Sequence, residues 1–354
     1  MNRRLTCLLS GVLAAAAAAA TGCSQYQPNP EHERQLRERA LDCLKRGVGY
    51  EWLPTVRVQS VEALQKTAGE QALPWIRHGL HDEHPAVRFA AALALGQMED
   101  RVAAPAIRKL LDSEVASDRI AAIFALHRLG DVSHTVELAS YLLESEDPTN
   151  QRHAALVLGR LKEKGAVKLL ARSMRSRDTG VRLNALEAMA LLGREEARSE
   201  LYAMAYSGAG SDETFAVTAL GELRDASLRG LYEQKLERGL HVETRLAAAR
   251  ALGMLGDRGG ADIARESLGY HATKELENDP VENQDLRVRQ LAALACGAIG
   301  DPQALPKLVR MMDDADDPRL QVAAAAAILQ ILGPPRQAST PFSARGPEPG
   351  VPTG

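Results

Sequence analysis

An apolar residue that recurs about every 31 residues constrains the fold of this chain more than any other feature. The reference positions are Leu64, Leu95, Leu126, Leu158, Met189, Leu220, Leu252, Cys296 and Leu329. A small residue, nearly always alanine, lies four positions before each of them. Residues i and i+4 share one face of an α-helix, and a small residue on that face lets a neighbouring helix come close. The spacing therefore predicts one closely packed helix in each of about nine repeats.

The second half of each repeat has its own signature. Pro74, Pro105 and Pro306 lie ten residues after their reference positions, and proline suits the first turn of a helix. Ahead of Pro306, Gly300 and Asp301 supply a helix stop followed by a capping acid. Each repeat is therefore predicted to be two helices joined by a short turn, and the chain an all-α solenoid of stacked helical pairs.

The composition agrees with a core built from closely packed helices. Aromatic residues make up only 4% of the chain and apolar residues 45%, so the core must consist largely of alanine and leucine. Sandwiches and barrels favour β-branched and aromatic residues instead. The 43 basic and 46 acidic residues nearly balance at a net charge of -3, which argues against a general nucleic-acid-binding protein.

A family resemblance lies in the segments VRFAAALALGQMED, RLAAARALGMLGD and VRQLAALACGAIGD. They closely resemble HEAT repeats of the short, phycobilisome-lyase-like type. The resemblance covers residues 31–333 and implies a right-handed superhelix of about nine helical pairs, with the inner helices lining its concave side. It implies the fold more strongly than the function, because such repeats serve as scaffolds, adaptors and a few enzymes.

The N-terminus resembles a bacterial lipoprotein signal. Two arginines precede an uncharged apolar stretch that is too short to span a membrane. The sequence ATGC at residues 20–23 resembles a lipobox, although leucine is usual where Ala20 stands. We therefore expect a signal peptide at residues 1–22, lipidation of Cys23 and a polar tether at residues 23–30. Ordinary secretion and an uncleaved anchor are the alternatives.

The expected location of the protein follows from this signal. Ser24 comes directly after the lipidated cysteine, and the resemblance to well-studied lipoprotein sorting then favours the outer membrane. We expect the protein in the cell envelope, lipid-anchored and facing the periplasm. At the other end, residues 334–354 are rich in proline and glycine and lack the repeat, so a disordered tail is predicted.

Two further cysteines, Cys43 and Cys296, lie near opposite ends of the repeat array. A solenoid is expected to hold its ends far apart, which argues against a disulfide between them. Both residues lie on apolar helical faces, where a buried free thiol is the expected state.

Arginine recurs seven residues before most reference positions. The series consists of Arg57, Arg88, Arg119, Arg182, Arg245 and Arg289. Such a series could form an anion-binding strip along a groove. A structural ladder is favoured, because in similar repeats this arginine pairs with an acid in the preceding turn, and Asp82 and Asp178 are suitably placed.

Candidates for chemistry are few. His78, His81 and His84 form the densest group of possible metal ligands, with a spacing that zinc or copper would accept. The helix dipole alone also favours histidines near a helix C-terminus. Among enzymes that the repeats resemble, deoxyhypusine hydroxylase binds iron through His-Glu pairs. Here only His153 occupies a comparable place, and Ala154 follows it instead of glutamate. We therefore expect no cofactor.

The spacing in sequence between the reference positions Leu252 and Cys296 is longer than the other spacings by about a dozen residues. The insertion falls within residues 269–286 and is rich in acids, and inserts in solenoids often serve binding. Possible partner-binding residues are His271, Glu275, Glu277, Asp279 and Glu282. A neutral loop extension is the alternative.

Together these features predict a non-catalytic, membrane-tethered scaffold or adaptor that acts as a monomer on an unidentified protein partner. The alternatives are a metal-dependent or lyase-like HEAT enzyme and a structural spacer or assembly factor of an envelope complex. No nucleic-acid partner is expected.

Overall fold

The computed structural model describes residues 29–275 and 278–333. The helices alternate between an outer and an inner layer, as the repeat predicts, and form nine successive pairs in this part of the chain. The outer helices are α1 (Pro30–Val48), α3 (Leu73–Gly79), α5 (Ala104–Lys109), α7 (Leu138–Leu143), α9 (Val167–Ser173), α11 (Glu195–Met204), α13 (Arg229–Arg238), α15 (Ala261–Ser267) and α17 (Leu305–Asp314). The inner helices are α2 (Pro54–Thr67), α4 (Pro85–Gln97), α6 (Ala116–Arg128), α8 (Pro148–Arg160), α10 (Thr179–Leu191), α12 (Gly210–Glu222), α14 (Val242–Met254), α16 (Val281–Ile299) and α18 (Pro318–Leu332).

Local signals in the sequence account for where these helices begin and end. Pro74, Pro105 and Pro306 occupy the first turns of α3, α5 and α17, as predicted. Gly300 ends α16 in a left-handed conformation, and the side chain of Asp301 accepts a hydrogen bond from the main chain of Gln303. The turn chemistry therefore fixes the two-helix unit, and the repeat stacks these units around one continuous core.

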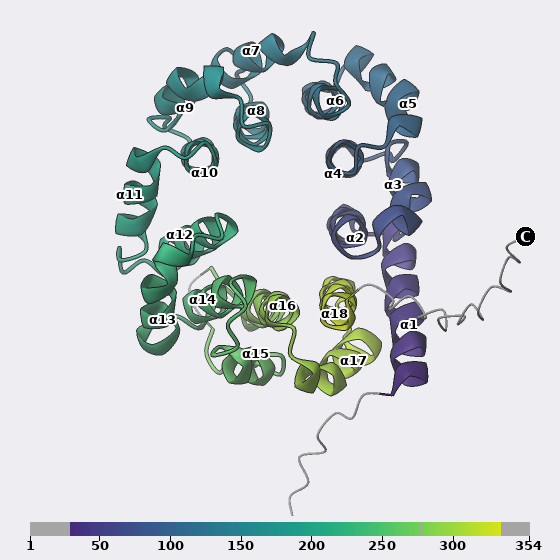
Figure 1. The fold of residues 1–354 in the computed structure, drawn as a ribbon, viewed down its shortest axis with the longest axis vertical. Coiled ribbons are helices and arrows are strands. Elements are labelled where there is room, and N and C mark those ends of the chain that lie inside the picture. The colour runs from purple at the N-terminus through teal and green to yellow at the C-terminus, as the bar shows by residue number, and fades with distance from the viewer. Residues whose placement is uncertain (1–28, 276–277, 334–354) are drawn as a thin grey trace, which may run out of the picture.

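The nine pairs close into a ring, which the sequence analysis did not anticipate. Figure 1 shows the first and last pairs side by side, and α18 packs against both α1 and α2. The expectation that the two ends of the solenoid lie far apart is therefore wrong, because the curvature accumulated over nine pairs brings them together. Cys43 and Cys296 are nevertheless both buried free thiols.

Hydrogen bonds and an ion pair join the two ends of the ring. Arg37 of α1 donates to the main-chain carbonyls of Leu332 and Gly333, at the C-terminal end of α18. Arg39 of α1 forms an ion pair with Asp313 of α17 at 2.7 Å. Apolar residues of α1, including Leu36, Ala40 and Leu44, are buried beneath these polar contacts. The outer helix of the first pair therefore covers the inner helix of the last.

Glycine at the position after the reference residue lets neighbouring inner helices approach closely. A Cβ atom added to Gly159 of α8 would lie only 2.6 Å from the Cα of Ala188 in α10. A Cβ atom added to Gly297 of α16 would likewise lie 3.2 Å from the Cα of Ala327 in α18. The contacted residue lies one position before the reference Met189 in α10 but two positions before the reference Leu329 in α18.

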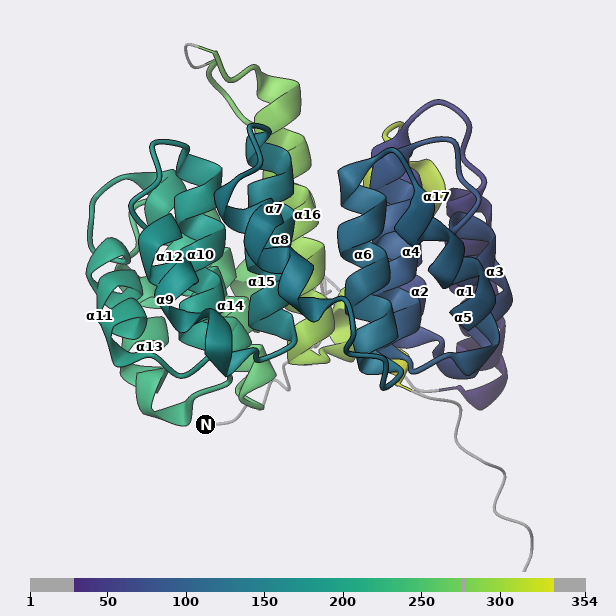
Figure 2. The same cartoon turned by 90° about the horizontal axis from the view of Figure 1, so that it is seen from above.

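The insertion is only partly a loop. Helix α16 has 19 residues whereas α14 has 13, and the extra turns at its N-terminal end are formed by the end of the insertion. Figure 2 shows this part of the chain rising above one end of the ring. Gln284 holds the loop to the helix by donating to the carbonyls of Lys274 and Asp279.

No helix within residues 29–275 and 278–333 is both long enough and apolar enough to cross a membrane.

Candidate functional site: the central channel

The six predicted ladder arginines hold the turns between outer and inner helices. Each donates to a main-chain carbonyl in or near the turn that precedes its own inner helix. These bonds run from Arg57 to Tyr50, Arg88 to Asp82, Arg119 to Ser113, Arg182 to Ser176, Arg245 to Leu236 and Arg289 to Leu268. Arg57, Arg88, Arg119 and Arg182 make further hydrogen bonds within the fold, whereas Arg245 and Arg289 make one each. The structural ladder stays our interpretation of this series.

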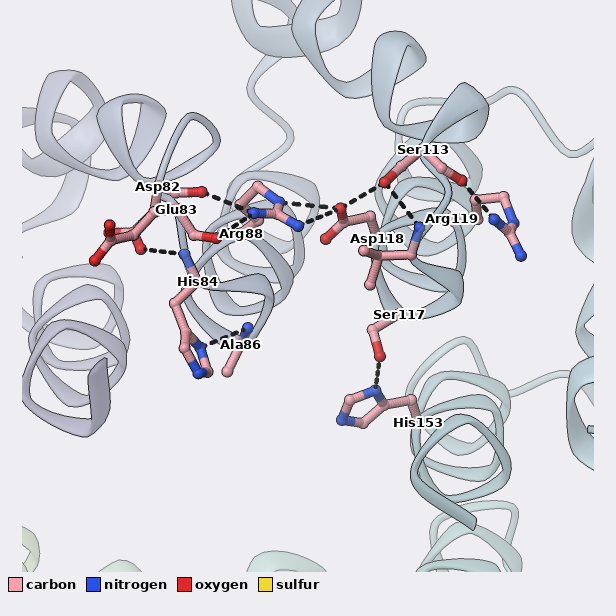
Figure 3. A network of polar contacts seen from close by, with 11 residues as sticks. Asp82, Glu83, His84, Ala86, Arg88, Ser113, Ser117, Asp118, Arg119 and His153 are labelled. Carbon is pink, nitrogen blue, oxygen red and sulfur yellow. Dashed lines mark hydrogen bonds and ion pairs between the residues drawn. The ribbon is translucent and has the colours of Figure 1, made fainter. Parts of the chain in front are cut away.

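Carboxylates from the following repeat complete part of this ladder (Figure 3). Arg57 pairs with Asp82 at 2.8 Å. Figure 3 shows Arg88 paired with Asp118, at 2.7 Å. The side chain of Asp118 is only 1% exposed, so Arg88 neutralises a buried charge at the first turn of α6. Asp178, expected to serve Arg182, instead accepts hydrogen bonds from Arg152 of α8.

A second set of ion pairs joins the outer helices to the following turns, and the sequence analysis missed it. The pairs are Arg77 with Asp100, Arg108 with Asp131, Arg198 with Asp225, Arg229 with Asp257 and Arg265 with Asp301. The signal was present, because these aspartates all lie five residues after a reference position. The sequence analysis interpreted Asp301 as a helix cap and predicted no ion pair for it.

The three histidines considered as metal ligands do not form such a group. Within the described ranges there is no cluster of three histidine, cysteine, aspartate or glutamate residues that could hold a metal ion. His78, His81 and His84 are all exposed. Nδ1 of His84 instead accepts a hydrogen bond from the main-chain N–H of Ala86 and so caps α4.

The candidate partner-binding residues of the insertion have different environments. His271 is exposed, and its Nδ1 lies 2.7 Å from a carboxylate oxygen of Asp285. Asp279 pairs with Arg287 at 2.9 Å, and the charged hydrogen bonds hold the pKa of this carboxyl below its usual range. Glu275 and Glu282 are exposed to solvent. Glu277 lies outside the described residues, as do Cys23, the signal segment and the C-terminal tail.

The inner helices face the centre of the ring (Figure 1). Three cavities are lined by residues of these helices, and all three share Thr218 of α12. We call this set of cavities the central channel. One, of about 1000 Å³, lies at the N-terminal ends of α12, α14 and α16, beside the insertion. The second, of about 480 Å³, lies at the C-terminal ends of α2 to α12. The third, of about 300 Å³, faces α16 and α18. We call the two ends of the channel the N-terminal and C-terminal openings.

The third cavity combines apolar and charged walls. Leu294 of α16 is 40% exposed, an unusual state for a leucine in the interior of a ring. In the same cavity, Arg250 of α14 pairs with Glu222 of α12 at 2.6 Å. An apolar surface beside fixed charges suits a polypeptide segment with both kinds of side chain.

Two titratable groups on neighbouring inner helices have unusual environments. His153 of α8 stacks on Phe89 with 4.0 Å between ring centroids, and its Nδ1 lies 2.9 Å from Oγ of Ser117. Burial lowers the pKa of this imidazole, so the neutral form is favoured. Glu187 of α10 lines the second cavity, and burial raises the pKa of its carboxyl. Sequence reasoning noted His153 only as an incomplete iron ligand and did not single out Glu187.

The sequence match to a family model agrees with this architecture. A family model described as HEAT repeats matches residues 50–127, 135–221 and 274–329. A search of curated proteins found no significant match. Among solved structures, human deoxyhypusine hydroxylase in complex with glycerol is 20% identical, with a TM-score of 0.33 over 86% of this chain and 99% of that one. The complex of CpcE and CpcF of phycocyanin lyase from Nostoc sp. PCC7120 is 18% identical, with a TM-score of 0.41 over 77% of this chain and 96% of that one. Because the family model matches more than half of the sequence, the chain belongs to the HEAT-repeat family.

Proposed function

We propose that this protein is a non-catalytic scaffold, tethered to a membrane through Cys23, that binds a segment of a protein partner in its central channel. The observation that carries this proposal is a contrast between two kinds of position on the inner helices. Positions that pack against neighbouring helices repeat with little variation, whereas positions that face the channel do not repeat.

The packing positions follow the needs of the fold. The residue before the reference is alanine in most repeats, and Gly96, Gly159 and Gly221 follow the reference where inner helices touch. These residues are explained by close helix packing alone. They would be the same for any function of the ring.

The channel positions differ from helix to helix. Two residues after the reference, successive inner helices carry Lys66, Gln97, Arg128, Arg160, Leu191 and Glu222, all of which line the second cavity. Helix formation does not require this mixture, because each residue type is tolerated in a last turn. An irregular lining of one continuous surface is what a specific binding site for a polypeptide needs.

The experiment is a pull-down of the natively expressed, tagged protein in mild detergent, read by mass spectrometry. Four forms are compared: wild type, Cys23→Ala, Leu294→Glu in the channel and Val136→Glu as a control. Val136 is 78% exposed in the outer turn Thr135–Glu137, away from the channel. Val136→Glu therefore introduces there the same carboxylate that Leu294→Glu introduces in the channel. Cell fractionation of the first two forms measures the tether.

The expected result is a stoichiometric partner with wild type and Val136→Glu that is lost with Leu294→Glu. Cys23→Ala should move the protein from the membrane to the soluble fraction and reduce recovery of an envelope partner, because tethering raises the effective concentration. A partner recovered equally with all four forms would show that its binding depends neither on the channel nor on the tether. If no form recovers a partner, the adaptor role itself is wrong.

A further inference from the structure

The C-terminal opening of the channel gathers cations around an apolar cavity. The second cavity, of about 480 Å³, is lined by Lys66 of α2, Arg160 of α8 and Lys162 just beyond α8. Phe124 and Phe215 contribute aromatic walls to the same cavity. All three cationic residues are exposed, so their charged groups are accessible to a ligand that enters from solvent.

Ion pairs within the ring leave an excess of positive charge here. Arg128 also lines the cavity, but it is paired with Glu99 at 2.8 Å. The carboxylate of Glu222 is held by Arg250 at 2.6 Å. Among the described residues, Lys66, Arg160 and Lys162 make no ion pair, and Glu187 is the one remaining carboxylate in the cavity wall. Arg160 interacts electrostatically with Glu187, and the opening carries three cations against this one acid.

The helix dipole does not by itself explain this arrangement. Cations are favoured in the last turn of any helix, yet the same position holds Gln97 in α4 and Leu191 in α10. Lys162 also has a left-handed backbone, with φ 54. Gly130 and Gly193 occupy this position in two other repeats, whereas Glu99 and Arg224 share the left-handed conformation of Lys162, which is strained for a residue with a side chain. A lysine at this position therefore has no backbone advantage.

We infer that the C-terminal opening binds an acidic segment of the partner protein whose carboxylates pair with Lys66, Arg160 and Lys162 and whose apolar side chains contact Phe215. This inference rests on the proposed function and names the chemistry of its ligand. The cations line a cavity inside the ring and lie beside aromatic side chains, which favours a polypeptide that enters the channel over the headgroups of a flat lipid surface. Charge complementarity of this kind gives specificity and fast association.

The test measures binding of a capped peptide of alternating glutamate and leucine, labelled with an uncharged dye, by fluorescence anisotropy with the full-length protein. Peptides with lysine or serine in place of glutamate are the ligand controls. Arg160→Glu reverses one charge in the cavity. Arg101→Glu makes the same change at the start of the exposed turn Arg101–Ala103, outside the cavity. Circular dichroism checks that both variants remain folded.

We expect saturable binding of the glutamate peptide alone, weakened about tenfold by Arg160→Glu, unchanged by Arg101→Glu, and weakened by added salt. Glu187→Gln removes the opposing acid and should strengthen binding about threefold. This gain of affinity keeps the test decisive if Arg160→Glu fails to fold. Equal weakening by Arg160→Glu and Arg101→Glu would show nonspecific attraction and overturn the inference.

Vesicles of anionic phospholipid test whether lipid headgroups, and not an acidic polypeptide, bind at this opening. If vesicles bind in an Arg160-dependent manner and the peptide does not, the opening is a headgroup site and the inference is wrong. If a native partner is recovered equally with wild type and Arg160→Glu but is lost with Leu294→Glu, the acidic-segment inference fails while the adaptor role stands. Loss of the partner with Arg160→Glu supports both the adaptor role and the acidic-segment inference.

Discussion

Arg37 in the first helix donates a hydrogen bond of 3.0 Å to the main-chain carbonyl of Leu332 in the last helix, across a separation of 295 residues. The carbonyls at the end of an α-helix have no partner within the helix. The guanidinium group of Arg37 supplies a donor to one of these carbonyls and so caps α18. The closure of the ring therefore includes a defined polar contact as well as apolar packing.

Replacing Arg37 with alanine should weaken the closure. We expect the free energy of unfolding to fall by about 1–2 kcal/mol, because partly buried carbonyls lose a charged donor. Chemical denaturation followed by circular dichroism measures the change. Arg34→Ala is the control on the same helix, since Arg34 is exposed and its ion pairs, with Glu31 and Glu38, lie within α1. Equal effects of the two variants would show that Arg37 has no special role in closure.

Cys43 offers a direct probe of opening at the same contact. It is buried on α1, and burial raises the pKa of its thiol. The pKa of Cys296, in α16, is raised to about 12. Both thiols should react slowly with iodoacetamide in the folded protein, because the thiolate is the reactive form.

Arg37→Ala should accelerate the alkylation of Cys43 and leave that of Cys296 nearly unchanged, as measured by mass spectrometry of peptides. This outcome would show that α1 opens locally. If both thiols accelerate equally, the variant increases global unfolding and the ends of the ring do not open as a separate unit.

Gly159→Ala should destabilise the stack of inner helices. The added methyl group would collide with the main chain of Ala188, and we expect a loss of about 1–3 kcal/mol, as for other overpacked cores. Gly230→Ala is the matched control, because a Cβ there meets no atom within 4 Å and Gly230 lies in the exposed part of α13. That control should gain up to about 1 kcal/mol from helix propensity. Thermal and chemical unfolding of both variants tests whether Gly159→Ala lowers and Gly230→Ala raises the free energy of unfolding.

Arg88→Met should be among the most harmful substitutions in the ladder. It leaves Asp118 buried without its cation, with only the hydroxyl of Ser113 as a side-chain donor, and we expect a loss of about 3–5 kcal/mol. Arg128→Met breaks the exposed pair with Glu99 and should cost at most about 1 kcal/mol. A small effect of Arg88→Met would mean that Asp118 is solvated or protonated in the folded protein.

His153 and Glu187 should make opposite contributions to the pH dependence of stability. Burial lowers the pKa of His153 in the folded state, so the unfolded chain binds more protons below pH 6.5, and this contribution to stability is lost as the pH falls through that window. Burial raises the pKa of Glu187, so the folded chain binds more protons above pH 4.5, and stability is lost as the pH rises.

Unfolding measured from pH 4 to pH 8 separates the two contributions. His153→Gln should reduce the loss of stability at the acidic end, whereas Glu187→Gln should stabilise the protein near neutral pH and have little effect near pH 4. A Glu187→Gln variant that gains nothing at neutral pH would indicate that the carboxyl is well solvated in the channel.

Local rules in the sequence were enough to predict the helical pair and its repetition. Reference residues such as Leu95, the alanines beside them and the glycines that follow report contacts within one repeat or with the next one. In α18 a run of alanines offers several equivalent positions, and the contact of Gly297 with Ala327 could not be predicted from the spacing.

Closure and the channel lining could not be predicted in the same way. Closure depends on a small rotation per repeat summed over nine pairs, so no single residue encodes it, and Arg37 looked like any other charge on α1. The channel residues are few per helix and come together only when the ring is complete. Lys66 and Glu222 are far apart in sequence, yet they line the same cavity.

A linear solenoid leaves an apolar face at each terminus, and open repeat arrays need polar terminal units to stay soluble. In this ring α1 and α18 cover each other, so neither end unit has an uncapped stacking face. The surface through which such repeats would otherwise stack end to end into filaments is consumed within the molecule. Adding or removing one repeat would therefore do more than change the length of the array: it would break the fit of the two ends and expose two adhesive faces at once.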